Sequence, residues 1–163
     1  MKRFLCLILA LCMLLCGCGF FGERVREPVT FYFLCSNYQE DLCCVIVPEE
    51  REGAGHTSDL AYMMALYQMG PSAENLISPL PTGTGIVSHT ENGQIFLELS
   101  DAAYSLSDLE YSLTCACLTL TCLDITEAES VTVTCGSRSK TMTRDSLVMY
   151  DTEEYTSTTE ENQ

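Results

Sequence analysis

The residues of this chain that are best suited to chemistry are its cysteines and histidines. Eleven cysteines and two histidines, His56 and His89, are spread over 163 residues. A cysteine thiolate can act as a nucleophile beside a histidine base, and cysteine and histidine side chains together can hold zinc. The spacing favours neither arrangement, because no histidine stands near a cysteine and the sequence contains neither G-x-S-x-G nor H-E-x-x-H. We therefore expect no catalytic residues, no metal site and no cofactor, and we do not expect an enzyme.

The cysteines between residues 115 and 122 lie in a segment with helical spacing. Cys115 and Cys122 are two helical turns apart, about 10.5 Å along the axis, which exceeds the ~7 Å Cα separation of a disulfide. Cys117 projects roughly 200° away from Cys115, so the three side chains do not converge on one zinc ion. The favoured interpretation of these cysteines is that they are small buried hydrophobic residues.

Two further chemical patterns lie earlier in the chain. Cys35 and Cys43 face each other across a predicted hairpin and are the pair placed for a disulfide, whereas Cys44 points to the opposite face of its strand. The acidic run Glu49-Glu50-Arg51-Glu52 lacks the alternating oxygen ligands and the glycine of a calcium-binding loop. We expect this run to be a solvated loop.

The N-terminus predicts an exported lipoprotein. Two basic residues precede the apolar run Phe4–Leu15, which at 1.5 Å per residue covers about 18 Å, less than the ~30 Å hydrocarbon core of a membrane. The sequence Leu15-Cys16-Gly17-Cys18 resembles the lipobox of bacterial lipoproteins. We expect residues 1–17 to be a lipoprotein signal peptide and Cys18 to become the lipidated N-terminus, which anchors the protein to a bilayer surface.

The charge of the chain excludes a phosphate-backbone binding face. The formal net charge is -15, and removal of residues 1–17 leaves 6 basic and 23 acidic residues, a net charge of -17. The same cleavage removes three cysteines and lipidation uses a fourth, so seven remain. Residues 18–27 are predicted to be a tether, residues 28–150 a folded domain, and residues 151–163 a disordered acidic tail.

The hydrophobic patterns of residues 28–150 predict an α+β fold. The order β-β-α-β-β-α-β favours a single mixed sheet with both helices on one face. The predicted elements are a hairpin of strands Val29–Cys35 and Leu42–Val47, ended by Pro48; a helix capped by Thr57 or Ser58 and stopped at Gly70-Pro71; a loop from Ser72 to Gly83; strands Ile86–Glu91 and Gln94–Leu99; a helix from the capping box Ser107-Asp108-Leu109-Glu110 to about Leu123; a strand Val131–Cys135; and a short edge element within Met142–Tyr150.

The Asn92-Gly93 pair fixes the register of the second hairpin, because both central residues of a type I′ turn need positive φ. Position 91 then faces position 94, and Ile86, Ser88 and Thr90 share the core face with alternate residues of the next strand. The opposite face carries Val87, His89, Phe96 and Glu98.

Five short strings of the sequence occur in a recognisable order. They are Val45-Ile46-Val47-Pro48-Glu49-Glu50-Arg51, Gly70-Pro71-Ser72, Ser78-Pro79-Leu80-Pro81-Thr82-Gly83-Thr84, Asn92-Gly93 and Phe96-Leu97-Glu98-Leu99-Ser100. Taken in this order, they resemble the GerMN domain of sporulation and spore-germination lipoproteins. The resemblance covers about residues 28–136 and implies a small α/β unit similar to ring-building motifs, without a known active site, used in envelope assemblies of Gram-positive bacteria.

The sequence therefore predicts a non-enzymatic lipoprotein, anchored through Cys18 to the outer face of the cell membrane. Its GerMN-like domain is expected to bind envelope, sporulation or germination proteins, and nucleic acid is not an expected partner. The alternative is an extracytoplasmic binding protein for a small ligand or a cell-wall glycan. That protein would use the exposed sheet face around Val87, His89, Phe96 and Glu98.

Overall fold

The computed structural model describes residues 28–37, 45–53 and 55–147. The predicted signal peptide, the lipidated Cys18, the tether, the acidic tail and the cysteines at positions 43 and 44 lie outside the described residues. The elements are β1 (Pro28–Cys35), β2 (Ile46–Glu52), α2 (Leu60–Gln68), β3 (Leu76–Ile77), β4 (Ile86–Glu91), β5 (Gln94–Leu99), the short helix η3 (Asp101–Ser105), α3 (Asp108–Ile125), β6 (Ser130–Cys135), β7 (Arg138–Met142) and the short helix η4 (Arg144–Ser146).

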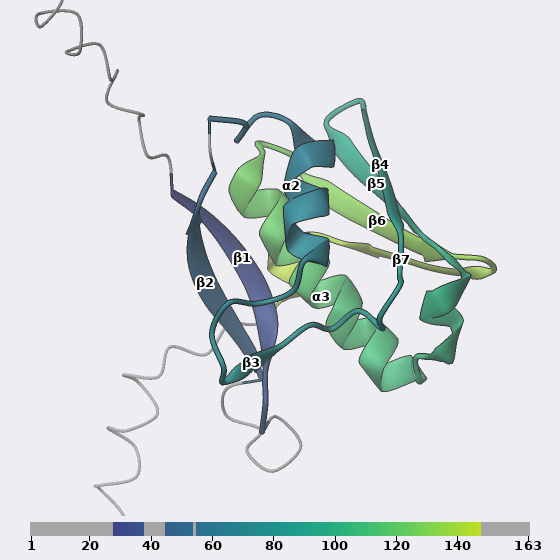
Figure 1. The fold of residues 1–163 in the computed structure, drawn as a ribbon. Coiled ribbons are helices and arrows are strands. Elements are labelled where there is room, and N and C mark those ends of the chain that lie inside the picture. Colours follow the sequence, from purple (N-terminus) through teal and green to yellow (C-terminus); the bar gives the residue numbers. More distant parts are fainter. Residues whose placement is uncertain (1–27, 38–44, 54, 148–163) are drawn as a thin grey trace, which may run out of the picture.

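These strands form two separate sheets, so the prediction of a single mixed sheet is wrong. The first sheet has the order β2-β1-β3 and the second has the order β4-β5-β6-β7. Figure 1 shows α2 and α3 between the two sheets. The fold is α+β, as predicted, but the helices do not lie together on one face of one sheet.

Helix α3 explains this arrangement. Every residue from Thr114 to Leu123 is buried, and the helix contacts β1 in one sheet and both β6 and β7 in the other. A helix that is buried all round needs apolar or small side chains on every face. Residues 114–123 contain only Ala, Cys, Leu and Thr. The sequence places one apolar stripe at helical spacing along this segment, which accounts for only part of the packing. The stripe consists of Leu106, Leu109, Leu113, Ala116, Cys117 and Leu120.

Strand β1 is buried on both faces. Phe31 and Phe33 belong to the main core, together with residues of both helices and the second sheet. Tyr32 and Leu34 point the other way and pack in a smaller cluster with Cys117 of α3. A strand buried on both faces has a continuous apolar sequence, which is why residues 31–34 show no polar alternation.

Strand β2 continues to Glu52, past Pro48, where the sequence predicts its end. Pro48 pairs with Tyr32, and β2 is an edge strand. An edge strand tolerates proline when the missing N–H group would have pointed away from the sheet. Residues 49–52 are therefore part of a strand, and the predicted solvated loop is wrong.

The β4–β5 hairpin has the predicted boundaries and register. Ile86 to Glu91 pair with Leu99 to Gln94, and Asn92 and Gly93 have φ angles of 50° and 76°. The residues of β5 on the predicted core face are buried, namely Ile95, Leu97 and Leu99.

The sequence analysis missed two strands. β3 lies inside the segment predicted to be a loop and pairs with the end of β1. β7 pairs with β6 through a two-residue turn, Gly136-Ser137, in which Gly136 has a φ of 56°. That φ fits the first central position of a type II′ turn. Because β7 starts at Arg138, the edge element predicted at Met142–Tyr150 starts four residues too late.

The helix ends follow local capping rules. Asp59, rather than Thr57 or Ser58, caps α2, and its side chain accepts a 3.1 Å hydrogen bond from the N–H group of Tyr62. Helix α3 starts with the predicted capping box of Ser107 and Glu110.

Candidate functional site

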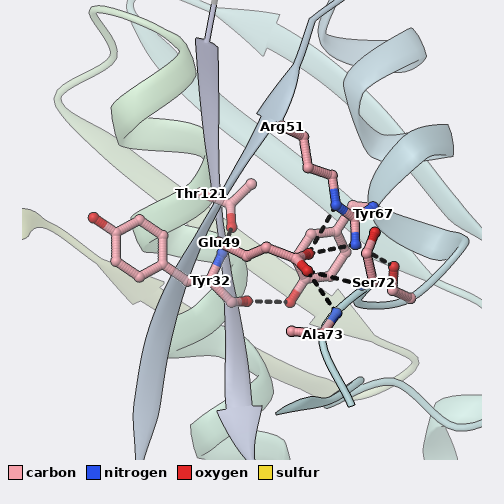
Figure 2. A network of polar contacts seen from close by, with 8 residues as sticks. Tyr32, Glu49, Arg51, Tyr67, Ser72, Ala73 and Thr121 are labelled. Carbon is pink, nitrogen blue, oxygen red and sulfur yellow. Dashed lines mark hydrogen bonds and ion pairs between the residues drawn. The ribbon is translucent and has the colours of Figure 1, made fainter. Parts of the chain in front are cut away.

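The polar residues of β2 form a clamp on the turn that follows α2. The Glu49 carboxylate accepts hydrogen bonds of 2.8 Å and 2.9 Å from the backbone N–H groups of Ser72 and Ala73. Its other oxygen accepts a 2.8 Å bond from Nε of Arg51, and Arg51 also donates to the Gly70 carbonyl oxygen at 2.5 Å. Figure 2 shows these contacts converging on Glu49.

The clamp is largely shielded from solvent. The side chains of Arg51 and Glu49 are 16% and 11% exposed. The Arg51 guanidinium lies 5.4 Å from the ring centroid of Phe31 and 5.3 Å from that of Phe33, which is cation–π geometry. Burial opposes the charged form of Glu49, but the hydrogen bonds from Arg51, Ser72 and Ala73 outweigh it and hold the pKa below its ordinary value.

A second polar group closes the side of β1 that β3 leaves uncovered. The N–H group of Tyr32 donates a 3.0 Å hydrogen bond to Oγ1 of Thr121 in α3, and the carbonyl oxygen of Tyr32 accepts a 2.9 Å bond from the hydroxyl group of Tyr67 in α2. Side chains from both helices therefore supply the hydrogen-bond partners that a neighbouring strand would otherwise give to Tyr32 (Figure 2). Because buried backbone groups need partners, these two side chains complete the first sheet.

The side chain of Tyr32 makes a third contact, toward the end of α3. Its hydroxyl group donates a 2.6 Å hydrogen bond to Oδ2 of Asp124, and Oδ1 of Asp124 accepts a 2.5 Å bond from Arg144 of η4. Burial, and then the bond to Asp124, raises the pKa of Tyr32 to about 12. This group holds the last described segment of the chain against α3.

Four of the described cysteines are packing residues. Cys115, Cys117 and Cys122 of α3 and Cys135 of β6 are fully buried and have free thiols. For the three cysteines of α3 this confirms the interpretation drawn from their helical spacing. Burial raises the pKa of Cys115 to about 11 and that of Cys122 to about 12, and it also raises the pKa of Cys117. Neutral, inaccessible thiols are poor nucleophiles and poor metal ligands. Cys35 is also a free thiol. Its pairing with Cys43, which the predicted hairpin register permits but the sequence does not favour, is not tested, because Cys43 lies outside the described residues.

The histidines contact aromatic rings. His56 packs against Tyr62 with ring centroids 4.6 Å apart, and His89 stacks on Phe96 at 4.9 Å with an angle of 9° between the rings. Within residues 28–37, 45–53 and 55–147 no cluster of three histidine, cysteine or acidic side chains could hold a metal ion.

The sheet face predicted as a ligand surface is exposed, and two grooves formed by the described residues lie elsewhere. Val87 is 65% exposed, and His89 and Glu98 are exposed beside it. One groove of about 300 Å³ lies along β2, and another of about 290 Å³ lies between β3 and the start of α3. Neither is lined by a residue of this face. The lining residues are Pro28, Glu50, Arg51 and Glu52 in the first groove and Leu34, Ile77, Ser78, Pro79, Leu80, Pro81, Ser105, Leu106 and Glu110 in the second.

None of the helices in the described part of the chain has the length and apolar character needed to cross a bilayer. The lipidated Cys18 stays a prediction, because the structure does not describe it.

Among solved structures, this chain is similar to the tandem GerMN domains of the sporulation protein GerM from Bacillus subtilis, with a TM-score of 0.50 and 18% identity. The fold is GerMN-like. The match covers 75% of this chain but 43% of the other, so the chain spans less than half the length of that protein. The sequence matches no protein-family profile and no curated protein.

Two more solved structures match this chain with TM-scores below 0.5. The first GerMN domain of the same Bacillus subtilis protein has a TM-score of 0.49 and 11% identity, with 70% of this chain and 86% of that chain covered. A candidate lipoprotein from Clostridium perfringens has a TM-score of 0.46 and 16% identity, with 74% and 89% covered.

The residues that carry the GerMN resemblance have structural roles in this chain. Glu49 and Arg51, from the first string, bind Gly70 and Ser72, from the second, so two strings that are 19 or more residues apart form one contact. The sequence analysis missed this contact because it placed Glu49 in a loop. Glu49 and Arg51 are two residues apart, so in a strand they lie on one face, and this spacing was the available signal of the contact. Pro48 led the sequence analysis to end the strand before them.

Proposed function

We propose that this protein is a membrane-anchored lipoprotein whose GerMN-like domain binds other proteins in envelope, sporulation or germination assemblies. Lipidated Cys18 holds it on the outer face of the cell membrane of a Gram-positive bacterium, and residues 19–27 separate the anchor from the domain. The domain contributes a binding surface and does not act as an enzyme.

The observation that carries this proposal is a GerMN-like fold that follows a lipobox-like sequence, Leu15-Cys16-Gly17-Cys18, in the chain. Several polar side chains that are shielded from solvent serve the fold: Glu49 and Arg51 clamp a turn, and Thr121 and Tyr67 complete β1. Glu49, Thr121 and Tyr67 line neither of the two described grooves, whereas a catalytic site leaves its polar groups facing a pocket where a substrate could reach them. The exposed surface is thus the part of the domain that is available to bind a partner.

The anchoring part of the proposal is tested by processing of the precursor. An inhibitor of signal peptidase II, or the change Cys18→Ser, should leave the precursor uncleaved and abolish incorporation of a labelled fatty acid. Cys35→Ser is the matched control, because Cys35 lies in the folded domain and should be processed normally. Unchanged maturation of the Cys18→Ser protein would overturn the anchor.

The binding part is tested by cross-linking in cells that are forming spores. The full-length protein, tagged at its C-terminus, should cross-link reproducibly to a small set of envelope or spore proteins. A version that keeps residues 1–27 but carries an unrelated soluble domain is the control for proximity at the membrane. Equal recovery of proteins with both versions would count against a specific binding role.

The alternative of a small-ligand or glycan-binding protein has weaker support. The stacked rings of His89 and Phe96 offer an aromatic platform, but neither described groove includes them, and small-molecule sites are usually concave. Binding of peptidoglycan fragments that is lost in Phe96→Ala and retained in Tyr104→Ala would favour this alternative.

A further inference from the structure

Strand β4 forms an open edge of the second sheet. It pairs with β5 alone. The two-residue turn makes Glu91 and Gln94 a hydrogen-bonded pair, so Ile86, Ser88 and Thr90 direct their backbone N–H and C=O groups away from β5. Within the described part of the chain these backbone groups accept and donate no hydrogen bond. A regular strand with such an edge is a template for pairing with another strand.

The edge of the other sheet is blocked at the equivalent place. Tyr32 directs its backbone groups toward Thr121 and Tyr67, away from β2, so its partner Pro48 lies at an outward-facing position of β2. Proline has no N–H group to offer a further strand. The chain therefore protects the β2 edge with proline, and β4 carries no proline or lysine.

Strand β7 is a shorter edge than β4. Its pairing with β6 leaves outward-facing backbone groups at two positions, Ser139 and Thr141, whereas β4 has three. β4 is thus the longest unprotected edge among the described strands.

The sequence of β4 is complementary to itself in one antiparallel register, and we infer that β4 pairs with β4 of a second copy of this chain around a two-fold axis at Ser88. Ile86 then faces the partner's Thr90 and Thr90 faces the partner's Ile86, so each outward N–H and C=O group gains a partner. This register uses all three outward positions, and a two-fold axis makes the interface isologous.

The exposed side chains also fit this register. Val87, which is 65% exposed, lies beside the partner's His89, which its own Phe96 holds in a stack. Glu91, the acidic residue of the strand, faces the partner's Gly85, so no two carboxylates lie opposite each other.

Helix α2 packs against β4 and carries small side chains on the side that bears Gln68. Gln68 donates a 2.8 Å hydrogen bond to the carbonyl oxygen of Thr84, just before β4. At 100° per residue, Ala61 and Ala65 lie on the same side of α2 as Gln68, and both are exposed. Small side chains therefore border the edge where a second copy would dock.

The pairing is tested with cysteine cross-linking of the full-length protein in membranes. In the inferred register the two copies of residue 88 form a hydrogen-bonded pair with Cα atoms about 5.5 Å apart, within the range of a disulfide. Ser88→Cys should give a disulfide-linked dimer on mild oxidation. Ser139→Cys, at the outward edge of β7, is the matched control and should give no more dimer than the unchanged protein. Equal cross-linking of the two variants would overturn the inference.

Sedimentation of the full-length protein in detergent provides the second readout. Ser88→Pro removes an outward N–H group that makes no bond to β5, so it should preserve the hairpin and raise the dimer dissociation constant at least about tenfold. Ser139→Pro should leave the dissociation constant unchanged. Salt should strengthen the dimer, because both copies carry net negative charge. A protein that stays monomeric at high concentration and high salt would refute the pairing, whatever the state of Cys18.

Discussion

The Glu49 carboxylate accepts a 2.8 Å hydrogen bond from the backbone N–H group of Ser72. This bond joins an edge strand of the first sheet to the turn that leaves α2, and Arg51 reinforces it by binding both Glu49 and the Gly70 carbonyl oxygen. The position of the segment between α2 and β3 therefore depends on one carboxylate.

Glu49→Gln should destabilise the protein by about 1.5–3 kcal/mol at neutral pH, because hydrogen bonds to a charged group contribute about that much. Urea unfolding followed by circular dichroism measures the effect. Glu50→Gln, at the exposed neighbouring position, is the control and should change stability by less than about 0.5 kcal/mol.

The same carboxylate predicts an acid limb in the stability profile. The pKa of Glu49 is lowered in the folded protein from an ordinary value of 4.5. Its contribution is therefore complete above pH 4.5 and is lost as the pH falls through the lowered folded pKa. Glu49→Gln should flatten this part of the profile. An acid limb of the same slope in the variant would show that other carboxylates cause it.

Thr121→Val should cost about 1–3 kcal/mol, because it leaves the buried N–H group of Tyr32 without an acceptor. Thr119, in the same buried part of α3, is a matched control, since its Oγ1 has no hydrogen-bond partner among the described residues. Thr119→Val should be neutral or stabilising. Similar losses in the two variants would show that the cost arises from packing and not from the bond to Tyr32.

Alkylation of the native protein should separate the cysteines into two classes. Cys35 is partly exposed and should react with iodoacetamide within minutes. Cys117 and Cys122 are fully buried, and burial raises the pKa of each thiol, so they should react only after unfolding. Peptide mapping by mass spectrometry measures both classes. Rapid native labelling of Cys117 would contradict the tight packing of α3.

Stability should also fall at alkaline pH. The buried thiols of Cys115 and Cys122 have pKa values raised from 9.0 to about 11 and about 12. Above pH 9 the unfolded chain loses these protons while the folded chain keeps them, so each rise in pH favours unfolding until the folded pKa is passed. Urea unfolding at pH 8 and pH 10 should show the decrease, and Cys122→Ala should reduce it. An equal decrease in that variant would assign the effect to other groups, such as buried tyrosines.

The parts of the fold that local sequence determines were predictable. The Asn92-Gly93 turn set the register of β4 and β5 because two residues of positive φ permit one short hairpin type. The capping box of Ser107 and Glu110 set the start of α3 for a similar reason. In both cases the deciding contacts lie within a few residues of each other.

The parts that depend on distant contacts were not predictable from patterns. Pro48 signals the end of a strand unless it is known that β2 lies at a sheet edge. The burial of α3 on all sides follows from two sheets closing around it, which a count of one apolar stripe does not reveal. Tyr32 and Thr121, which bond across 89 positions in the chain, illustrate the limit of the local signals.

The position of α3 has a consequence for the order in which this chain folds. β1 is near the start of the domain, yet its open side is covered by Thr121, which is synthesised much later. A growing chain that ends before α3 would expose the face of β1 that carries Tyr32 and Leu34, and it would leave the N–H group of Tyr32 without its acceptor. We expect such a chain to remain unfolded until α3 is complete, which is compatible with the export that we propose for this protein.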